Sequence, residues 1–261
     1  MNVEPLLNSL LLWVLIFIRI ISALVVMPLF GHEGFPLIAK IGLAACLALL
    51  LLPNVSPPTG WAGIGSGLLA FTALILPEIA MGVLIGMLAH FLFYGVKLAG
   101  EYIGMQMGFG IVQIIDPQTQ QQSSIIGHFQ YLFAVLIFLV FNGHHFLLSG
   151  LQQTFSAVPL GGVQFSSGLV DMFVVGMGKI FVAAVKIGAP VMAALFLADV
   201  VLGFVARTVP QMNVFIVGFP LKIGLGLFAL ALSLPMFVYV LELLWKNFQG
   251  DWLRFIALFN P

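Results

Sequence analysis

Long apolar stretches, separated by short polar breaks, run through the chain from end to end. The breaks fall at positions 31–34, 53–60, 116–124, 158–162 and 209–213. Since a membrane-spanning helix needs about 20 mostly apolar residues, this pattern predicts an all-α protein of the membrane type. The apolar stretches are Leu10–Phe30, Leu37–Leu52, Gly67–Val96, Ile125–Leu148, Gly168–Ala206 and Val214–Trp245.

Several of these stretches contain internal prolines, and two are too long to be single straight spans. Pro77 and Pro190 lie inside the third and fifth stretches, and Pro220 and Pro235 lie inside the last one. Proline removes a backbone donor and kinks a helix, so we expect bent helices or tight helical hairpins here. No long polar linker, low-complexity tract or convincing repeat divides the chain, which favours a single domain over residues 1–261.

Composition supports a membrane class and excludes several others. Of the 261 residues, 62% are hydrophobic and 7% are charged, against roughly a quarter charged in soluble domains. The nine basic residues are scattered, so we expect no nucleic-acid partner. The N-terminus lacks the basic start of a cleaved signal peptide, so the first apolar stretch is expected to remain. Cys46 is expected to be a small buried hydrophobe.

Isolated charges lie within the apolar stretches, where each would cost several kcal/mol facing lipid. One explanation is pairing inside the bundle, with Lys97–Glu101 and Asp199–Arg207 as expected buried ion pairs. The other is that much of the chain faces protein subunits or water. The loops carry almost no Lys or Arg, so they predict no orientation in the membrane. The interior charges are Arg19, Glu78, Lys179, Lys186, Asp199 and Lys222.

Small residues recur four apart along the predicted helices. Gly100, Gly104 and Gly108 form one such stripe, and Gly203 lies midway between Asp199 and Arg207. Because such stripes let helix backbones approach closely, we expect Gly100, Gly104 and Gly203 to be helix-packing positions.

Enzyme chemistry finds little support in the chain. His144-His145 lacks the spacing of a zinc-binding helix, and no second cluster completes a metal site. No nucleophile elbow of the G-x-S-x-G type is present. We therefore expect no enzymatic activity, no cofactor and no metal.

Three blocks of sequence resemble one family closely. They are AGEYIGMQMGFGIVQIIDP (99–117), FNGHHFLLSGL (141–151) with PLGG (159–162), and LADVVLGFVARTVPQMNVFIVGFPLK (197–222). Together they resemble the FliR family, whose members are membrane components of the flagellar type III export apparatus with counterparts in virulence injectisomes. The resemblance covers nearly the whole chain.

The resemblance implies a hetero-oligomer with FliP and FliQ subunits, in which bent helical hairpins pack into a right-handed spiral around an export channel. One copy of the FliR-like chain is implied, FliP-like over residues 1–190 and FliQ-like over 191–261. The resemblance further implies FlhA, FlhB and unfolded flagellar subunits as partners, and the bacterial inner membrane at the flagellar basal body as the location. An equivalent injectisome subunit and a secondary transporter are the alternatives.

Within the first block, the resemblance implies a loop that plugs the channel, corresponding here to residues 108–122. A gate that stops ions yet yields to any unfolded chain should be hydrophobic, deformable and without specific binding. Gly108 and Gly110 would then supply hinge freedom, with Met105 and Met107 as adaptable flanks and Asp116-Pro117 as the end of the element. The apolar bulk would come from Phe109, Ile111, Val112, Ile114 and Ile115.

Overall fold

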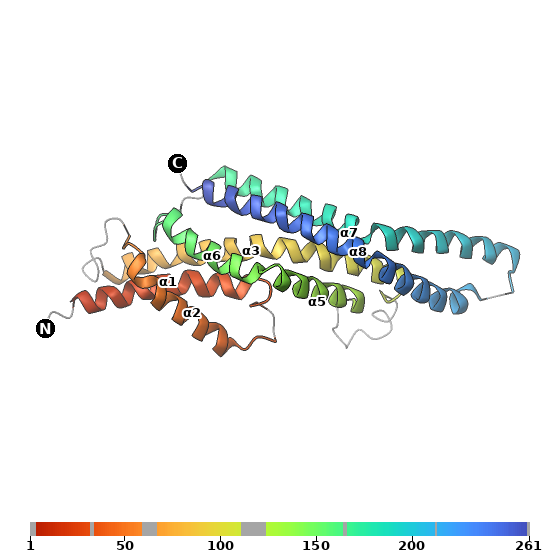
Figure 1. Cartoon of the computed structure of the whole chain (residues 1–261), viewed down its shortest axis with the longest axis horizontal. Helices are drawn as coiled ribbons and strands as arrows, with labels where there is room; N and C mark the ends of the chain where they lie inside the picture. The colour runs from red at the N-terminus through yellow and green to blue at the C-terminus, as the bar shows by residue number, and fades with distance from the viewer. Residues whose placement is uncertain are drawn as a thin grey trace. The chain divides into compact units, whose positions relative to one another are not determined.

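The computed structural model describes residues 4–31, 34–58, 67–110, 124–163, 166–211 and 213–259. Within these ranges every regular element is helical, which confirms the predicted all-α class (Figure 1). Five helices are long and apolar enough to cross a membrane, and α5 with α6 could form a sixth span. The elements are α1 (Glu4–Val26), α2 (Leu37–Leu51), η1 (Leu52–Asn54), α3 (Gly67–Met107), α5 (Ile125–Val140), α6 (Gly143–Ala157), α7 (Ser167–Thr208) and α8 (Val214–Ala257).

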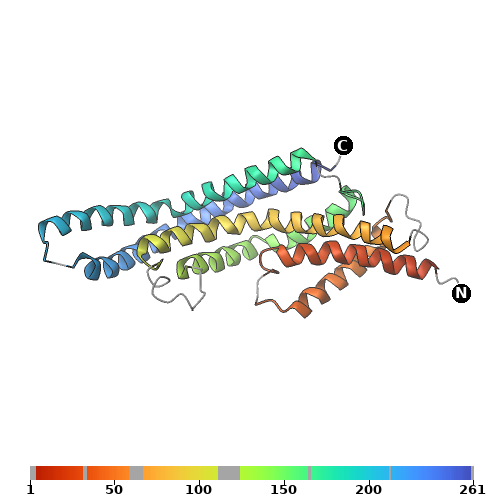
Figure 2. The same ribbon diagram turned by 180° about the vertical axis from the view of Figure 1, so that it is seen from behind.

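The long apolar stretches form continuous helices that pass through their prolines. Helices α3, α7 and α8 have 41, 42 and 44 residues and contain Pro77, Pro190, and Pro220 with Pro235, respectively. The alternative that a single stretch folds into a hairpin is therefore wrong. The hairpin instead joins two stretches, since α7 and α8 run side by side (Figure 2).

One stretch is divided where the sequence pattern predicted continuity. Between α5 and α6, Asn142 adopts a left-handed conformation with φ 55°. Asparagine tolerates this conformation better than most residues, and Gly143 follows at the start of α6. A helix cannot continue through such a residue, so Ile125–Leu148 is two helices rather than one.

The chain forms two compact units, and α3, α7 and α8 contribute to both. Unit 1 comprises Met1–Phe91, Phe141–Gly176 and Phe248–Pro261, and unit 2 comprises Leu92–Val140 and Met177–Asn247. These boundaries follow spatial contacts within the chain. The predicted division into a FliP-like part, 1–190, and a FliQ-like part, 191–261, concerns similarity to other subunits and not contacts within the chain. It stays a prediction.

In unit 1, α1 packs closely on α3 and aromatic rings fill the space beside α6. Ser22 and Val26 of α1 lie where side chains at Gly82 and Gly86 of α3 would point, so only glycine allows this approach. The two helices run side by side in both views (Figures 1 and 2). On the other side, the Trp252 ring covers Gly150 of α6.

Helix α2 packs on α1 and leaves one face open. Ile38 is 85% exposed, and Cys46 is also exposed. The prediction that Cys46 is buried is therefore wrong. An apolar neighbourhood in sequence does not specify which side of a helix the protein core covers, because the surroundings of a membrane-type chain are themselves apolar.

Candidate functional site

The glycine-rich end of α3 forms a Schellman motif that stops the helix. The Gly108 N–H donates to the Met105 carbonyl at 3.1 Å, and the Phe109 N–H donates to the Gly104 carbonyl at 3.1 Å. These are the two hydrogen bonds of that motif, which requires a left-handed residue at the first position past the helix. Gly108 has φ +96°. In this structure Gly108 is therefore a fixed helix stop, which differs from the predicted hinge.

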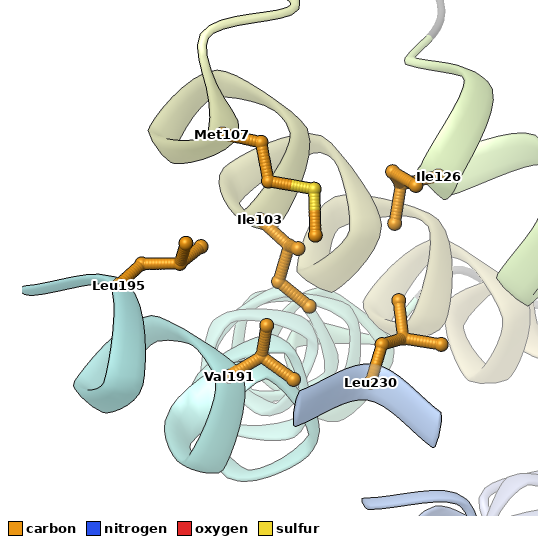
Figure 3. Close-up of a cluster of buried hydrophobic side chains, with 6 residues drawn as sticks. All are labelled: Ile103, Met107, Ile126, Val191, Leu195 and Leu230. Atoms are coloured by element: carbon orange, nitrogen blue, oxygen red, sulfur yellow. The ribbon is translucent and has the colours of Figure 1, made fainter. Parts of the chain in front are cut away.

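The side chains on either side of this stop are held in the core of unit 2. Met107 is fully buried in an apolar cluster (Figure 3), and Phe109 packs against the same cluster. An apolar contact of this kind commonly accompanies a Schellman motif. The buried members of the cluster are Ile103, Met107, Ile126, Val191, Leu195 and Leu230.

The two methionines predicted to flank a gate have opposite environments. Met105 is 59% exposed, whereas Met107 is 0% exposed. Residues two apart on a helix point to different sides, so only Met105 is free to contact a ligand or partner. A side chain at Gly226 of α8 would overlap Met107, which shows how tightly that methionine is enclosed.

The last turns of α3, from Gly100 to Met107, lead into the 108–122 segment and are called the α3 stem below. Glycines hold this stem close to its neighbours, as predicted. A β-carbon at Gly100 would overlap the backbone of Gly127 in α5, and one at Gly104 would overlap the side chain of Ser124. Helix α3 therefore meets the start of α5 with almost no side chain between them. The end of α3 and the start of α5 are thus held next to each other in unit 2.

The central part of the predicted plug lies outside the described residues. This applies to Ile111, Val112, Ile114, Ile115 and Asp116-Pro117, whose roles stay predictions. Of the remaining plug residues, Gly110 has no described residue other than its chain neighbours within 4 Å of where its side chain would be. Among the contacts described, Gly110 is therefore more open than Gly108.

The sequence predicts two ion pairs among the residues that form unit 2, and the structure contains one of them. The Lys97 Nζ lies 3.9 Å from the Glu101 Oε1, as predicted, but both side chains are more than 30% exposed, so the pair is not buried. Asp199 pairs with Lys222 of α8 at 2.7 Å, and the predicted Asp199–Arg207 pair is wrong. Eight residues along a helix span about 12 Å, which is too far for direct contact, whereas α8 runs alongside α7.

The remaining members of the predicted Asp199 face are open. Beyond its chain neighbours and its own helix backbone, no described residue lies within 4 Å of the side-chain position at Gly203, and Arg207 is exposed. The prediction that Gly203 packs against another helix is therefore not met within the described part of this chain.

Arg19 is fully enclosed, and the sequence did not identify its partners. Its Nε donates to the Glu78 Oε2 at 2.5 Å, and both side chains are 0% exposed. Its Nη1 donates to two carbonyl oxygens at the end of α6, those of Thr154 at 3.2 Å and Val158 at 2.9 Å. A cation at the carboxyl end of a helix also interacts favourably with the helix dipole.

The contacts of Arg19 with Glu78 and the end of α6 are called the clamp below. Glu78 extends the clamp to the turn after α6. Its second oxygen, Oε1, accepts the Gly161 N–H at 2.8 Å, and Gly161 is in the left-handed conformation with φ +72°. The Arg19 guanidinium also lies 4.6 Å from the centre of the Phe155 ring, within the range of a cation–π contact. One buried ion pair thus joins α1, α3, α6 and the PLGG turn of unit 1.

Neither site carries the features of a catalytic centre. The described ranges contain no group of three His, Cys, Asp or Glu residues that could hold a metal ion. The clamp is closed to solvent, and the α3 stem consists of glycine contacts and apolar packing. Their chemistry is suited to holding helices in place and to presenting the 108–122 segment.

Comparisons with known proteins identify the family of this chain. A family model described as "Bacterial export proteins, family 1" matches residues 10–248. The chain is 38% identical to the flagellar biosynthetic protein FliR of Bacillus subtilis (strain 168) over 238 residues, covering 88% of each chain. It is 31% identical to FliR of Aquifex aeolicus (strain VF5), covering 94% and 93%, and 28% identical to FliR of Escherichia coli (strain K12), covering 84% and 82%. The chain therefore belongs to the bacterial export proteins, family 1, the family of the flagellar FliR proteins.

Proposed function

We propose that the protein is a core subunit of the flagellar type III export gate. In this role it forms, with FliP and FliQ, the channel through which unfolded flagellar subunits leave the cell, next to FlhA and FlhB in the inner membrane at the basal body. Its part is structural rather than enzymatic. Family membership supports the export role, and the flagellar names of the three relatives favour a flagellum over an injectisome.

The lengths of the helices are the observation that carries the proposal of a multi-subunit assembly. At about 1.5 Å per residue, α3, α7 and α8 are each about 60 Å long, twice the roughly 30 Å of a bilayer's hydrocarbon core. Large apolar side chains are exposed along them, such as Leu76, Phe181 and Phe228 at 71%, 57% and 63%. A bilayer cannot cover such lengths, so neighbouring protein subunits are the suited partners.

Exposed charges within the same helices support this reading. Lys179 and Lys186 of α7 are both exposed and lie in the middle part of a helix whose neighbouring residues are mostly apolar. Charges near the centre of a bilayer are costly, but they are readily accommodated beside polar groups of another subunit or beside water. This favours an assembly over a single chain surrounded by lipid.

The pinned stem supports a plug formed by the segment that follows Phe109. Gly100 and Gly104 fix the exit from α3 beside the entry to α5, and the Schellman motif fixes the chain as far as Phe109. A loop of about 12 irregular residues is long for a plain connection between helices. A segment with fixed ends and an apolar middle can block a constriction and yield without disturbing the surrounding helices.

The test is deletion of Gly110–Ile115, which retains the helix stop at Gly108. The expected result is an assembly of unchanged subunit composition whose membrane conducts small ions, because the apolar block is gone. Conductance of the deletion strain is measured alongside native mass measurement of the purified complex. A control replaces Gln118–Gln122 with glycine and serine and should keep the membrane tight. Unchanged conductance of a correctly assembled deletion complex would contradict the plug.

A further inference from the structure

Unit 1 has a surface pocket that is separate from the α3 stem and combines polar and apolar side chains. It lies between the end of α2 with η1 and the outer side of α6, and its volume is about 300 Å³. That volume is at the lower end of ligand pockets, which measure about 300–1,000 Å³. Its lining residues are Leu51, Asn54, Val55, Ser149, Gln152, Gln153, Phe155 and Ser156.

The rim of the pocket consists of neutral amides and hydroxyls. The side chains of Asn54, Gln152 and Gln153 are exposed and make no hydrogen bond in the described part of the chain. Each amide offers two donors and a carbonyl acceptor. The rim can therefore recognise a ligand that both donates and accepts hydrogen bonds.

The two hydroxyl groups of the rim are committed as donors. The Ser149 Oγ donates to the His145 carbonyl at 2.6 Å, and the Ser156 Oγ donates to the Gln153 carbonyl at 2.8 Å. Each hydroxyl has one proton, so toward the pocket both oxygens act as acceptors. They favour a ligand that brings N–H or O–H donors.

The floor is apolar and part of it is rigidly held. Val55 and Phe155 are 9% and 7% exposed, and Leu51 completes the apolar lining. The Phe155 ring is fixed from within by the Arg19 guanidinium. A preformed floor of this kind lowers the entropic cost of binding, and it provides space for a single small aliphatic side chain.

These features exclude several classes of ligand. None of the lining residues in the described ranges carries a charge, so a phosphate or a carboxylate would lose its hydration without an ionic partner. The volume is too small for a helix packed lengthwise. A sugar ring would need an aromatic face to stack on, and Phe155, the aromatic residue of the lining, is only 7% exposed.

We propose that this pocket binds an uncharged, extended peptide segment of another protein. One aliphatic side chain of that segment lies on Leu51, Val55 and Phe155. Its backbone N–H groups donate to Ser149 and Ser156, while its carbonyl groups accept from the amides of Gln152 and Gln153. Peptide recognition of this type obtains affinity from main-chain hydrogen bonds and specificity from a side-chain pocket.

A small-molecule probe tests the chemistry of the pocket. N-acetyl-leucine methylamide, a capped neutral peptide unit, is titrated into the full chain within its purified complex and followed by ligand-observed NMR. The double variant Gln152→Ala/Gln153→Ala should bind at least about tenfold more weakly, the equivalent of about 1.4 kcal/mol. The matched control Gln249→Ala removes an amide of α8 away from the pocket and should bind as the unchanged chain does. Equal binding by all three proteins would overturn the proposal.

Two further probes define the ligand class. N-acetyl-leucine, which carries a carboxylate, and N-acetylglucosamine should both bind more weakly than the neutral peptide unit. Tighter binding of the sugar would identify a carbohydrate site instead, and tighter binding of the carboxylate would contradict the neutral-ligand argument. Either result overturns the peptide proposal and leaves the proposed plug unaffected.

The natural occupant is tested by photo-crosslinking in intact membranes. A photoreactive amino acid at Ser149 should form a crosslink that mass spectrometry maps to an uncharged, non-helical segment of a different protein. The Gln152→Ala/Gln153→Ala background should reduce the yield of that crosslink, and the Gln249→Ala background should not. Crosslinks only to lipid, to this chain itself or to a helix would overturn the assignment.

Discussion

In unit 1 a buried ion pair joins α1 to α3 beside the close contacts at Gly82 and Gly86, whereas in unit 2 the approach of α3 to α5 rests on glycines. Arg19 and Glu78 use hydrogen bonds and charge to hold four chain segments together. Gly100 and Gly127 bring two backbones together without any side-chain bond. The first contact combines polar bonds with close backbone packing at Gly82 and Gly86, and the second rests on the absence of side-chain atoms.

Each contact leaves a buried polar atom without a partner among the described residues. In unit 1 the Glu78 carboxylate uses both oxygens, but the Arg19 Nη2 has no hydrogen-bond partner there. In unit 2 the buried Ser124 Oγ and Gln130 Oε1 have none, and both groups lie beside the glycine contact. The clamp still has four hydrogen bonds that would have to break if its helices shifted, whereas the α3–α5 contact is specified by shape.

The largest effect is expected from breaking the Arg19–Glu78 clamp. Arg19→Leu or Glu78→Leu alone leaves an unpaired buried charge and should lower the free energy of unfolding by about 3–5 kcal/mol. The double variant Arg19→Met/Glu78→Leu should recover at least half of that loss, because no lone charge remains. Denaturation of the full chain in mixed micelles measures all three. A double variant as unstable as either single variant would show that the hydrogen bonds to α6 and Gly161 outweigh the ion pair.

A smaller loss is expected from filling the glycine contact of unit 2. Gly127→Leu places a side chain against the backbone of Lys97 and should cost about 1–3 kcal/mol, as overpacking generally does. Gly203→Ala, at an open position of α7, is the control and should be neutral or stabilise the isolated chain by up to about 1 kcal/mol. The same denaturation assay applies. Equal losses in the two variants would mean that close helix approach is not what requires glycine at this site.

Local features of the sequence predicted which face of the α3 stem packs, but they did not predict that Gly108 ends the helix. The spacing of Gly100 and Gly104 identified the packing face because helical periodicity is a local property. The GMQMGF stretch also contains a helix-stop signal, a glycine followed by an apolar residue that contacts the last helical turn. Gly108 was interpreted as a hinge because the left-handed requirement shows only in the backbone geometry.

Partners that lie far apart in sequence were not predictable to the same degree. Arg19 and Glu78 were recognised as charges within apolar stretches, but 59 residues separate them, and no periodicity connects two different helices. Their opposite signs and their position in long apolar stretches were the available signal. Asp199 was assigned to Arg207 on its own helix for the same reason, because its partner Lys222 becomes a neighbour only when α7 and α8 form a hairpin.

Substituting Gly108 separates a helix stop from a hinge. A non-glycine residue held in the left-handed conformation costs about 1–2 kcal/mol, and a side chain here would also overlap the Phe219 ring. Gly108→Ala should therefore destabilise unit 2 by about that amount. Gly110→Ala, at an open position, should have little effect on stability. A larger loss of stability in Gly110→Ala than in Gly108→Ala would contradict this. The fixed part of the chain would then extend beyond Phe109, and the plug segment would begin later than proposed.

The smallest effect is expected at the Asp199–Lys222 pair, which resembles the clamp in charge but not in burial. Asp199 is 46% exposed and Lys222 15%, so the pair should contribute only about 0.2–1 kcal/mol, as exposed ion pairs do. Reversal of both charges in Asp199→Lys/Lys222→Asp should restore most of the stability lost in either single variant. Asp199→Lys/Arg207→Asp should restore none, because those side chains do not meet. A double-mutant cycle measures both couplings, and a larger coupling to Arg207 would refute the observed partner of Asp199.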